Sequence, residues 1–177
     1  MHGGLKRLQM QRLRNLPHRR IWFSVLSAAC MAALLIWIAG SETVMGGIQR
    51  GLAHVTNGVL HAFGHRTVVA GSTVSSDRFG ITVVTACTGL FTTGLFLIAV
   101  IGYPSGWRSK LVGVGLGVAG IFLLNVVRLV SLYYIGVHLP AFLDSAHQLI
   151  WQSMLIVFAV ALWLLWAGRW AHAPRRA

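Results

Sequence analysis

The chain has 177 residues, of which 56% are hydrophobic and only 10% are charged, and its mean hydropathy is +0.71. Because soluble domains carry about a quarter charged residues, this composition excludes a disordered protein, a disulfide scaffold and almost any water-soluble enzyme. The sequence therefore predicts an all-α membrane protein.

The net charge of +12 is distributed as in a membrane protein rather than as in a nucleic-acid binder. Most of the 15 Lys and Arg residues lie in the N-terminal segment 1–20, in the turn at Arg108 and Lys110, and in the tail 168–177. Cytoplasmic segments of membrane proteins are enriched in Lys and Arg, and anionic lipid headgroups are sufficient partners for such clusters. We therefore expect membrane lipids, and no nucleic acid, as partners of these segments.

Four apolar runs are predicted to cross the membrane, since about 20 apolar residues span a hydrocarbon core of about 30 Å. A cleaved signal peptide is the alternative for the first run, but its length favours a retained helix, because a signal-peptide core is usually about 7–15 residues long. Four crossings place both termini in the cytoplasm of a plasma-membrane protein. The predicted spans, which form a multi-pass domain over residues 21–167, are residues 21–39, 86–103, 111–134 and 146–167.

The segment 40–85 lies on the outer side in this topology and is predicted to form an amphipathic helix and a small β-hairpin. From Val44 to Phe63, apolar residues recur every three or four positions, which is typical of a helix at the membrane interface. Residues 66–74 and 79–84 are rich in β-branched side chains, and a short polar segment separates them. This pattern predicts a hairpin that leads into the second span.

Two further motifs favour structural roles. Residues 115–120 match GxGxxG, but the dinucleotide fingerprint needs a preceding strand and an aqueous helix N-terminus. Inside an apolar run, Gly113, Gly117 and Gly120 indicate close helix–helix packing instead. Cys30 lies in the middle of the first span, where we expect a small buried side chain with an inert thiol.

Three histidines in the outer segment, His54, His61 and His65, raise the question of a metal site. No carboxylate or thiol in the same stretch completes a set of ligands, and the alternative is the polar face of an interfacial helix. We therefore predict no metal and no cofactor.

Cys87 stands at the outer beginning of the second span, where Thr85 is predicted to cap the helix. A cysteine in a first helical turn lies at the positive end of the helix dipole, which favours the reactive thiolate. The alternative is another buried structural cysteine.

Arg128 lies within the third apolar run, where a charged side chain is costly and usually functional. It is roughly 26 Å along a helix from Leu111, near the predicted depth of Cys87, and Asn125 shares its helix face. The alternative is an interfacial arginine that extends to the headgroups.

His147 falls at the outer first turn of the fourth span, with Asp144 as the predicted cap. A neutral histidine at this place suits a general base, whereas the alternative is a solvated interfacial histidine. Three spans thus deliver Cys87, Arg128 and His147 to one outer layer. A thiol nucleophile needs a base and a positive group where oxyanion charge develops, and these three residues meet those needs.

On these residues the sequence resembles the exosortase/archaeosortase family of multi-pass membrane cysteine transpeptidases. The resemblance rests on Ala86-Cys87-Thr88-Gly89-Leu90, on Asn125-Val126-Val127-Arg128 and on His147, over about residues 66–150. Family members more often carry Ser after the cysteine, so Thr88 is a departure, and many have additional N-terminal spans.

The resemblance implies that the partner is the C-terminal sorting signal of an exported protein: a motif, a transmembrane helix and a basic tail. It implies that Cys87 forms a thioester with the motif, that Arg128 stabilises the oxyanion and that His147 transfers the proton. Asn125 and Thr88 are expected to bind substrate. The alternatives are a cysteine protease, which uses water as acceptor, and a non-catalytic scaffold for exopolysaccharide export.

Overall fold

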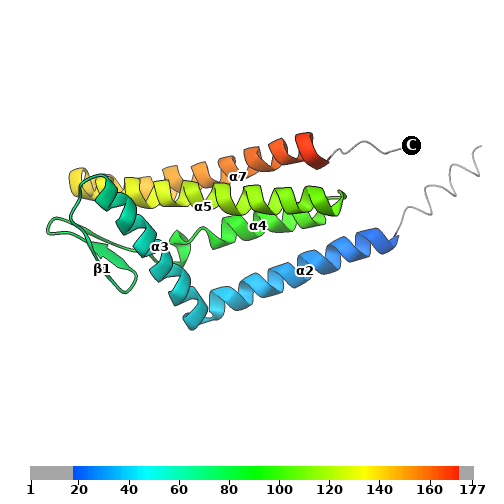
Figure 1. Cartoon of the computed structure of the whole chain (residues 1–177), viewed down its shortest axis with the longest axis horizontal. Coiled ribbons are helices and arrows are strands. Elements are labelled where there is room, and N and C mark those ends of the chain that lie inside the picture. Colours follow the sequence, from blue (N-terminus) through cyan, green and yellow to red (C-terminus); the bar gives the residue numbers. More distant parts are fainter. Residues whose placement is uncertain (1–17, 172–177) are drawn as a thin grey trace, which may run out of the picture.

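The computed structural model describes residues 18–171 and, within them, all side chains except those of residues 18–21, 23 and 24. The predicted basic segments therefore lie partly outside the described residues, at 1–17 and 172–177. The structure is mostly helical, with a small sheet at one end (Figure 1). Its main elements are α2 (His18–Gly40), α3 (Glu42–Ala62), β1 (Val68–Ala70), β2 (Thr73–Ser75), β3 (Gly80–Thr82), α4 (Leu90–Gly102), α5 (Trp107–His138) and α7 (Gln152–Trp166).

The described helices include two that are long and apolar enough to cross a membrane: Trp107–His138 and the continuous helical segment Pro140–Ala171, each of 32 residues. A third span is possible if Val25–Gly40 and Glu42–Ala62, which meet at a bend of 79°, are counted together. Four spans are therefore not confirmed.

The second predicted span is shorter than expected, because residues 85–87 form a separate 3₁₀ turn and α4 begins only at Leu90. Its 13 residues extend over about 20 Å, less than the hydrocarbon core of about 30 Å. The chain leaves α4 before Pro104, a residue that cannot continue the backbone hydrogen-bond pattern of a helix.

The sheet has three antiparallel strands in the order β1-β2-β3, so the predicted single hairpin is corrected to two. The additional turn lies at Gly71 and Ser72, between the paired residues Ala70 and Thr73. Gly71 has φ +63°, the left-handed conformation that tight hairpin turns require. The β-branched pattern of residues 66–74 predicts one strand, because it does not include this glycine as a turn signal.

The amphipathic helix predicted from Val44 to Phe63 is present as α3, but its buried face differs in part from the predicted one. Leu52, Ala53 and Leu60 pack against Val74 of the sheet and against α5, as part of the same cluster that contains Cys87. By contrast, Val55 and Phe63, which the periodicity placed on the apolar face, are exposed. The expectation that Cys30 is buried is wrong, since its side chain is exposed on α2.

Gly113 and Gly117 of α5 lie where neighbouring helices approach closely, as the sequence predicted. A Cβ atom on Gly117 would overlap the Phe96 ring, and one on Gly113 would lie 2.7 Å from the Trp166 indole nitrogen. No side chain larger than hydrogen fits at these positions without displacing a ring. The close approach holds α4 and the C-terminal helix against α5.

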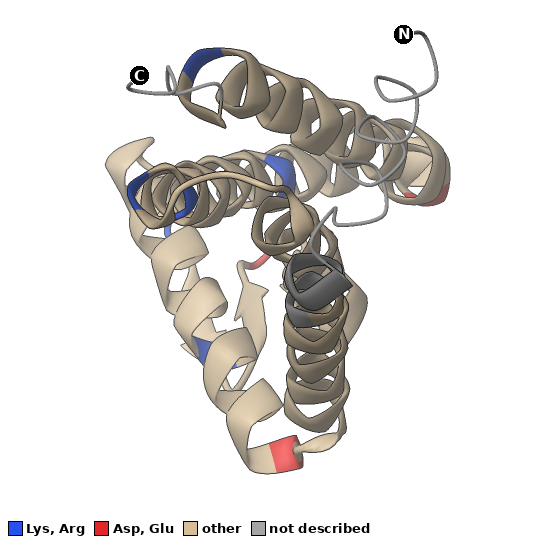
Figure 2. Ribbon diagram, turned by 90° about the vertical axis from the view of Figure 1, so that its right-hand side faces the viewer, with Lys and Arg blue, Asp and Glu red and all other residues tan. Residues whose placement is uncertain are grey.

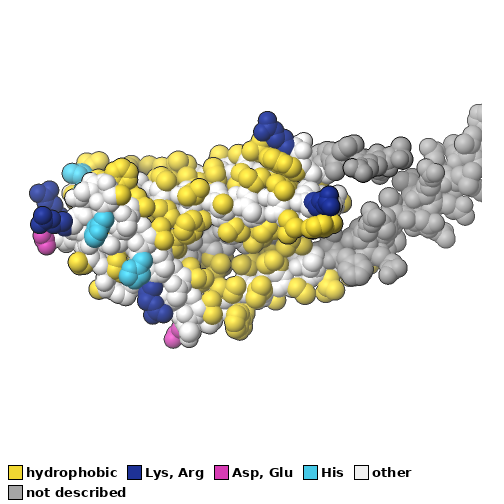
Figure 3. All heavy atoms as spheres, in the orientation of Figure 1, with side chains coloured by type: hydrophobic (Ala, Val, Ile, Leu, Met, Phe, Trp, Pro, Cys, Tyr) yellow, Lys and Arg dark blue, Asp and Glu magenta, His cyan; other side chains and the backbone are white. Residues whose placement is uncertain are grey.

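The molecule is elongated, and α2 begins at the same end at which α7 finishes, whereas the sheet and α3 lie at the other end (Figure 1). Viewed from the side opposite the sheet, the helices carry few charged positions (Figure 2). On the face in Figure 3, hydrophobic side chains cover the middle and the Lys and Arg side chains lie toward the two ends. This distribution fits a protein whose middle lies in a bilayer.

Candidate active site

Cys87 lies in a tight turn between the sheet and α4. Its amide donates to the carbonyl of Val84 at 2.8 Å, and the Thr88 hydroxyl donates to the carbonyl of Thr85 at 2.7 Å. The residue before α4 is Gly89, with φ +70° and no side-chain cap. The predictions that Thr85 caps this helix and that Cys87 occupies its first turn are wrong, because the 3₁₀ turn Thr85–Cys87 precedes the helix.

Asn125 of α5 holds this turn in place. Its Nδ2 donates to the carbonyl oxygen of Cys87 at 2.8 Å, and the Asn125 side chain is only 1% exposed. A Cβ atom on Gly89 would lie 3.3 Å from the Asn125 side chain. The turn therefore needs a glycine both for its left-handed backbone and for the close approach of the amide.

The Cys87 thiol meets the His147 imidazole, although the two residues are 60 positions apart. Sγ lies 3.3 Å from Nε2, and the cysteine side chain is 4% exposed. Contact between a nucleophile and a base at hydrogen-bonding distance is the arrangement that allows proton transfer. The structure thus brings together the two residues that the sequence placed in one layer.

The helix around His147 is not regular, because residues Ala146–Trp151 have π-helical geometry. Such short π segments are rare and are frequent at functional sites. The helical chain begins earlier than predicted, at Pro140, so His147 is not in its first turn and Asp144 makes no cap hydrogen bond. Asp144 interacts electrostatically with His147 instead.

Arg128 provides the third element of the site and is almost completely buried, at 1% exposure. Its charge interacts with both Cys87 and His147. Within residues 18–171, its Nε and Nη1 atoms have no hydrogen-bond partner. Since buried polar groups are nearly always satisfied, these two nitrogens, unpaired within the described part of the chain, point to a group that binds something negative.

A cavity of about 350 Å³ opens next to the catalytic candidates. Arg128 lines it, together with Ala86 and Gly89 on either side of the cysteine turn. The cavity therefore offers space for a substrate carbonyl close to Cys87.

Two residues that were predicted to bind substrate are engaged within the protein. Asn125 donates to the backbone of Cys87, and the Thr88 hydroxyl both donates to Thr85 and accepts from the amide of Leu90. Their binding of substrate stays a prediction. Gln152, which lines the cavity from the fourth helical segment, was not identified from the sequence. A polar residue within an apolar membrane run is the signal that would have identified it.

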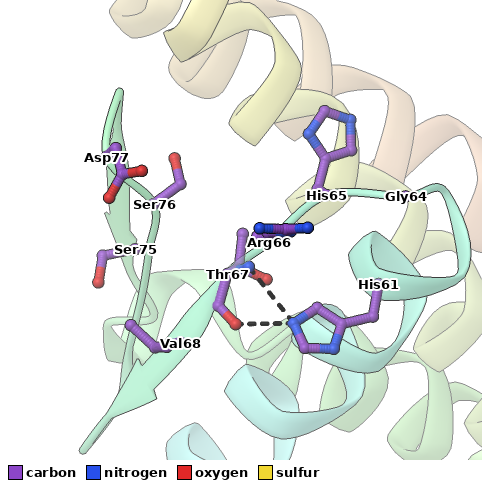
Figure 4. Close-up of a pocket in the computed structure, with 9 residues that line it drawn as sticks. All are labelled: His61, Gly64, His65, Arg66, Thr67, Val68, Ser75, Ser76 and Asp77. Atoms are coloured by element: carbon purple, nitrogen blue, oxygen red, sulfur yellow. Dashed lines mark hydrogen bonds between the residues drawn. The ribbon is translucent and has the colours of Figure 1, made fainter.

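A second pocket, of about 610 Å³, lies between the end of α3 and the sheet (Figure 4). It contains two of the three histidines considered for a metal site. His61 Nε2 lies 2.7 Å from the carbonyl oxygen of Thr67, and His65 Nε2 lies 2.8 Å from the Tyr134 hydroxyl. Across the described part of the chain, no three His, Cys, Asp or Glu side chains are arranged to hold a metal ion.

Fold and site together define a helical membrane protein that holds a cysteine–histidine pair beside a buried arginine. A model of the transmembrane exosortase family (EpsH type) matches residues 17–167. The chain therefore belongs to the transmembrane exosortase family. Neither a search of curated proteins nor a search of solved structures found a match to this chain.

Proposed function

We propose that the chain is a cysteine transpeptidase that cleaves the C-terminal sorting signal of exported proteins and transfers them to a surface acceptor. The observation that carries the proposal is the distance of 3.3 Å between Cys87 Sγ and His147 Nε2. Membership of the exosortase family supports the same type of activity.

In the first half-reaction, His147 accepts the Cys87 thiol proton and the thiolate attacks the scissile carbonyl. Arg128 stabilises the negative charge on the carbonyl oxygen of the tetrahedral intermediate. The C–N bond then breaks, the leaving amine takes the proton from His147, and a thioester remains on Cys87. The released fragment carries the transmembrane helix and basic tail of the substrate.

In the second half-reaction, an acceptor hydroxyl or amine attacks the thioester carbonyl. His147 removes the acceptor proton and returns it to the cysteine sulfur as the thioester bond breaks. The product is the substrate protein joined to a glycan or lipid. With water as acceptor, the same steps give hydrolysis.

We place the active site on the outer face of the plasma membrane, with both termini in the cytoplasm. Arg108, Lys110 and Arg169 lie at the ends of helices away from the sheet, where the positive-inside rule favours the cytoplasm. Cys87 packs in the cluster that includes Val74 of the sheet. A substrate helix in the bilayer then presents its outer juxtamembrane motif at the level of Cys87.

The test compares cells that carry the wild-type chain with cells that carry Cys87→Ala. Loss of the nucleophile is expected to leave one or more exported proteins uncleaved, with their C-terminal helix intact. Mass spectrometry of these proteins in wild-type cells identifies the acceptor, because transfer adds its mass to the new C-terminus.

Cys30→Ala is the matched control, since Cys30 is exposed and far from His147 in sequence. It is expected to process substrates normally. A free carboxylate at the new C-terminus in wild-type cells would identify a protease. Unchanged processing with Cys87→Ala would contradict an enzymatic role and favour a scaffold.

A further inference from the structure

The cavity beside Arg128 continues into an apolar groove between α4 and the C-terminal helix. The groove has a volume of about 500 Å³ and shares Phe91, Thr92 and Gln152 with that cavity. We propose that this groove binds the transmembrane helix of the substrate and so aligns the adjacent sorting motif with Cys87. The inference rests on the proposed function and adds to it the surface that receives the substrate.

The shape of the groove fits a helix. Along the C-terminal helix its wall runs from Gln152 through Ile156 and Val160 to Trp163, positions that share one helix face. This stripe extends over roughly 16 Å. Phe91 and Leu95 of α4 form the facing wall. Two helices side by side give a longitudinal groove, which is the geometry that receives an apolar helix.

The lining of the groove also fits a helix. Ala99 and Ala159 are small, and small residues at membrane interfaces let helix backbones approach closely. None of the residues that line the groove is Lys, Arg, Asp or Glu, so an apolar helix enters without burying a charge. The polar side chains Thr92 and Gln152 lie at the junction with the cavity, where the first amides of a bound helix need hydrogen-bond acceptors.

The neighbouring helix α2 covers another face of α4 and leaves the face that lines the groove open. Leu35 of α2 packs so closely against Gly94 that a Cβ atom on this glycine would overlap the leucine side chain. By contrast, Phe91 and Leu95 are exposed large apolar side chains. The groove is therefore reached sideways from the bilayer, and its continuity with the Arg128 cavity favours a peptide substrate over an acyl chain.

The test uses the uncleaved precursor that accumulates with Cys87→Ala. In that background, the photoreactive residue p-benzoylphenylalanine replaces either Val160, which lines the groove and is 53% exposed, or Val157, which does not line it and is 66% exposed. Irradiation is expected to link the precursor's C-terminal helix to the protein through position 160 and not through position 157.

A second measurement uses active protein with Cys30→Ala. Val160→Trp is expected to lower precursor processing about tenfold, equivalent to about 1.4 kcal/mol, whereas Val157→Trp leaves it unchanged. If iodoacetamide alkylates Cys87 of the Val160→Trp variant at the wild-type rate, the active site of this variant is intact. An equal effect of the two tryptophans would overturn the proposal.

The photochemical outcomes separate the two proposals. A precursor that accumulates but reacts at position 157 as well as at 160 would overturn the groove and leave the transpeptidase standing. An adduct at position 160 that contains only lipid or a second copy of this chain would also overturn the groove and leave the transpeptidase standing. No accumulation with Cys87→Ala would overturn the proposed function and the groove together.

Discussion

At the scale of single residues, the site depends on a thiol and an imidazole that the fold brings to 3.3 Å from each other. A cysteine is a poor nucleophile while it keeps its proton, so the rate of acylation depends on the base that removes it. The positions of Cys87, Arg128 and His147 in the sequence were sufficient to predict that they share a layer. The contact itself was not predictable, because the hydrophobic pattern does not reveal the π-helical segment in which His147 lies.

We predict that His147→Ala lowers precursor processing by roughly 10²–10⁴-fold, because it removes the base while leaving the nucleophile in place. Processing is measured as the ratio of cleaved to uncleaved substrate. Gln148→Ala, one position along the same helix, is the control and is expected to process normally. Equal loss in the two variants would show that this segment acts through its structure rather than through the imidazole.

Arg128 gives a second prediction, because its Nε and Nη1 atoms have no hydrogen-bond partner among residues 18–171, and a buried charge in this state destabilises the fold. Arg128→Met is expected to lower processing roughly 10²–10³-fold, as loss of an oxyanion-stabilising donor does. Its thermal unfolding temperature in detergent is expected to equal or exceed that of the wild type. A marked decrease in that temperature would mean that the guanidinium supports the structure.

The sequence predicts the position of Asn125 but not its hydrogen bond. Its position one helical turn before Arg128 correctly indicated a place near the site. Its hydrogen bond to the Cys87 carbonyl depends on the turn at Gly89. That turn was missed because residues 86–89 contain no charged residue and no proline that would separate them from the apolar helix that follows.

At the scale of elements, periodicity predicted the long helices well and the interrupted ones poorly. The third span predicted at 111–134 lies within α5, and the amphipathic helix is present as α3. The α4 helix is shorter and the sheet has one more strand, because hydrophobicity averaged over a window does not register single glycines such as Gly71 and Gly89. The buried face of α3 also depends on the sheet that packs against it.

The glycines of α5 allow a test of helix packing. Gly117→Ala is expected to lower the free energy of unfolding by about 1–3 kcal/mol, because the added methyl group overlaps the Phe96 ring. Gly115→Ala, two positions away, has no described residue within 4 Å of its added Cβ atom and is expected to be neutral or slightly stabilising. Denaturant titration in micelles measures both. Equal free energies for the two variants would contradict the close packing.

At the scale of the whole molecule, the distribution of charge and hydrophobic side chains is consistent with a membrane protein, and the family match agrees with it. Two described helices are long enough to cross a membrane, and a bent pair counted as one span makes a third. Sequence composition identified the membrane protein correctly. It did not reveal that α4 begins only at Leu90, after the turn at Gly89.

The proposed orientation is tested with single cysteines in a Cys30→Ala, Cys87→Ala background. Asp77 is exposed at the sheet end. Gly106 is exposed at the opposite end, and no described residue comes within 4 Å of the position of its added Cβ atom. The two variants are Asp77→Cys and Gly106→Cys. A membrane-impermeant maleimide applied to spheroplasts is expected to label the first and not the second. The reverse pattern would place the active site in the cytoplasm.

The most direct test of the central claim is to trap the thioester with hydroxylamine. The measured quantity is the mass of the substrate's new C-terminus after cells that carry the wild-type chain are treated with this nucleophile. A thioester on Cys87 predicts a C-terminal hydroxamate, formed at the expense of the acceptor-linked product and absent with Cys87→Ala. A substrate that stays intact, or one that is cleaved without hydroxamate, would contradict catalysis through a Cys87 acyl-enzyme.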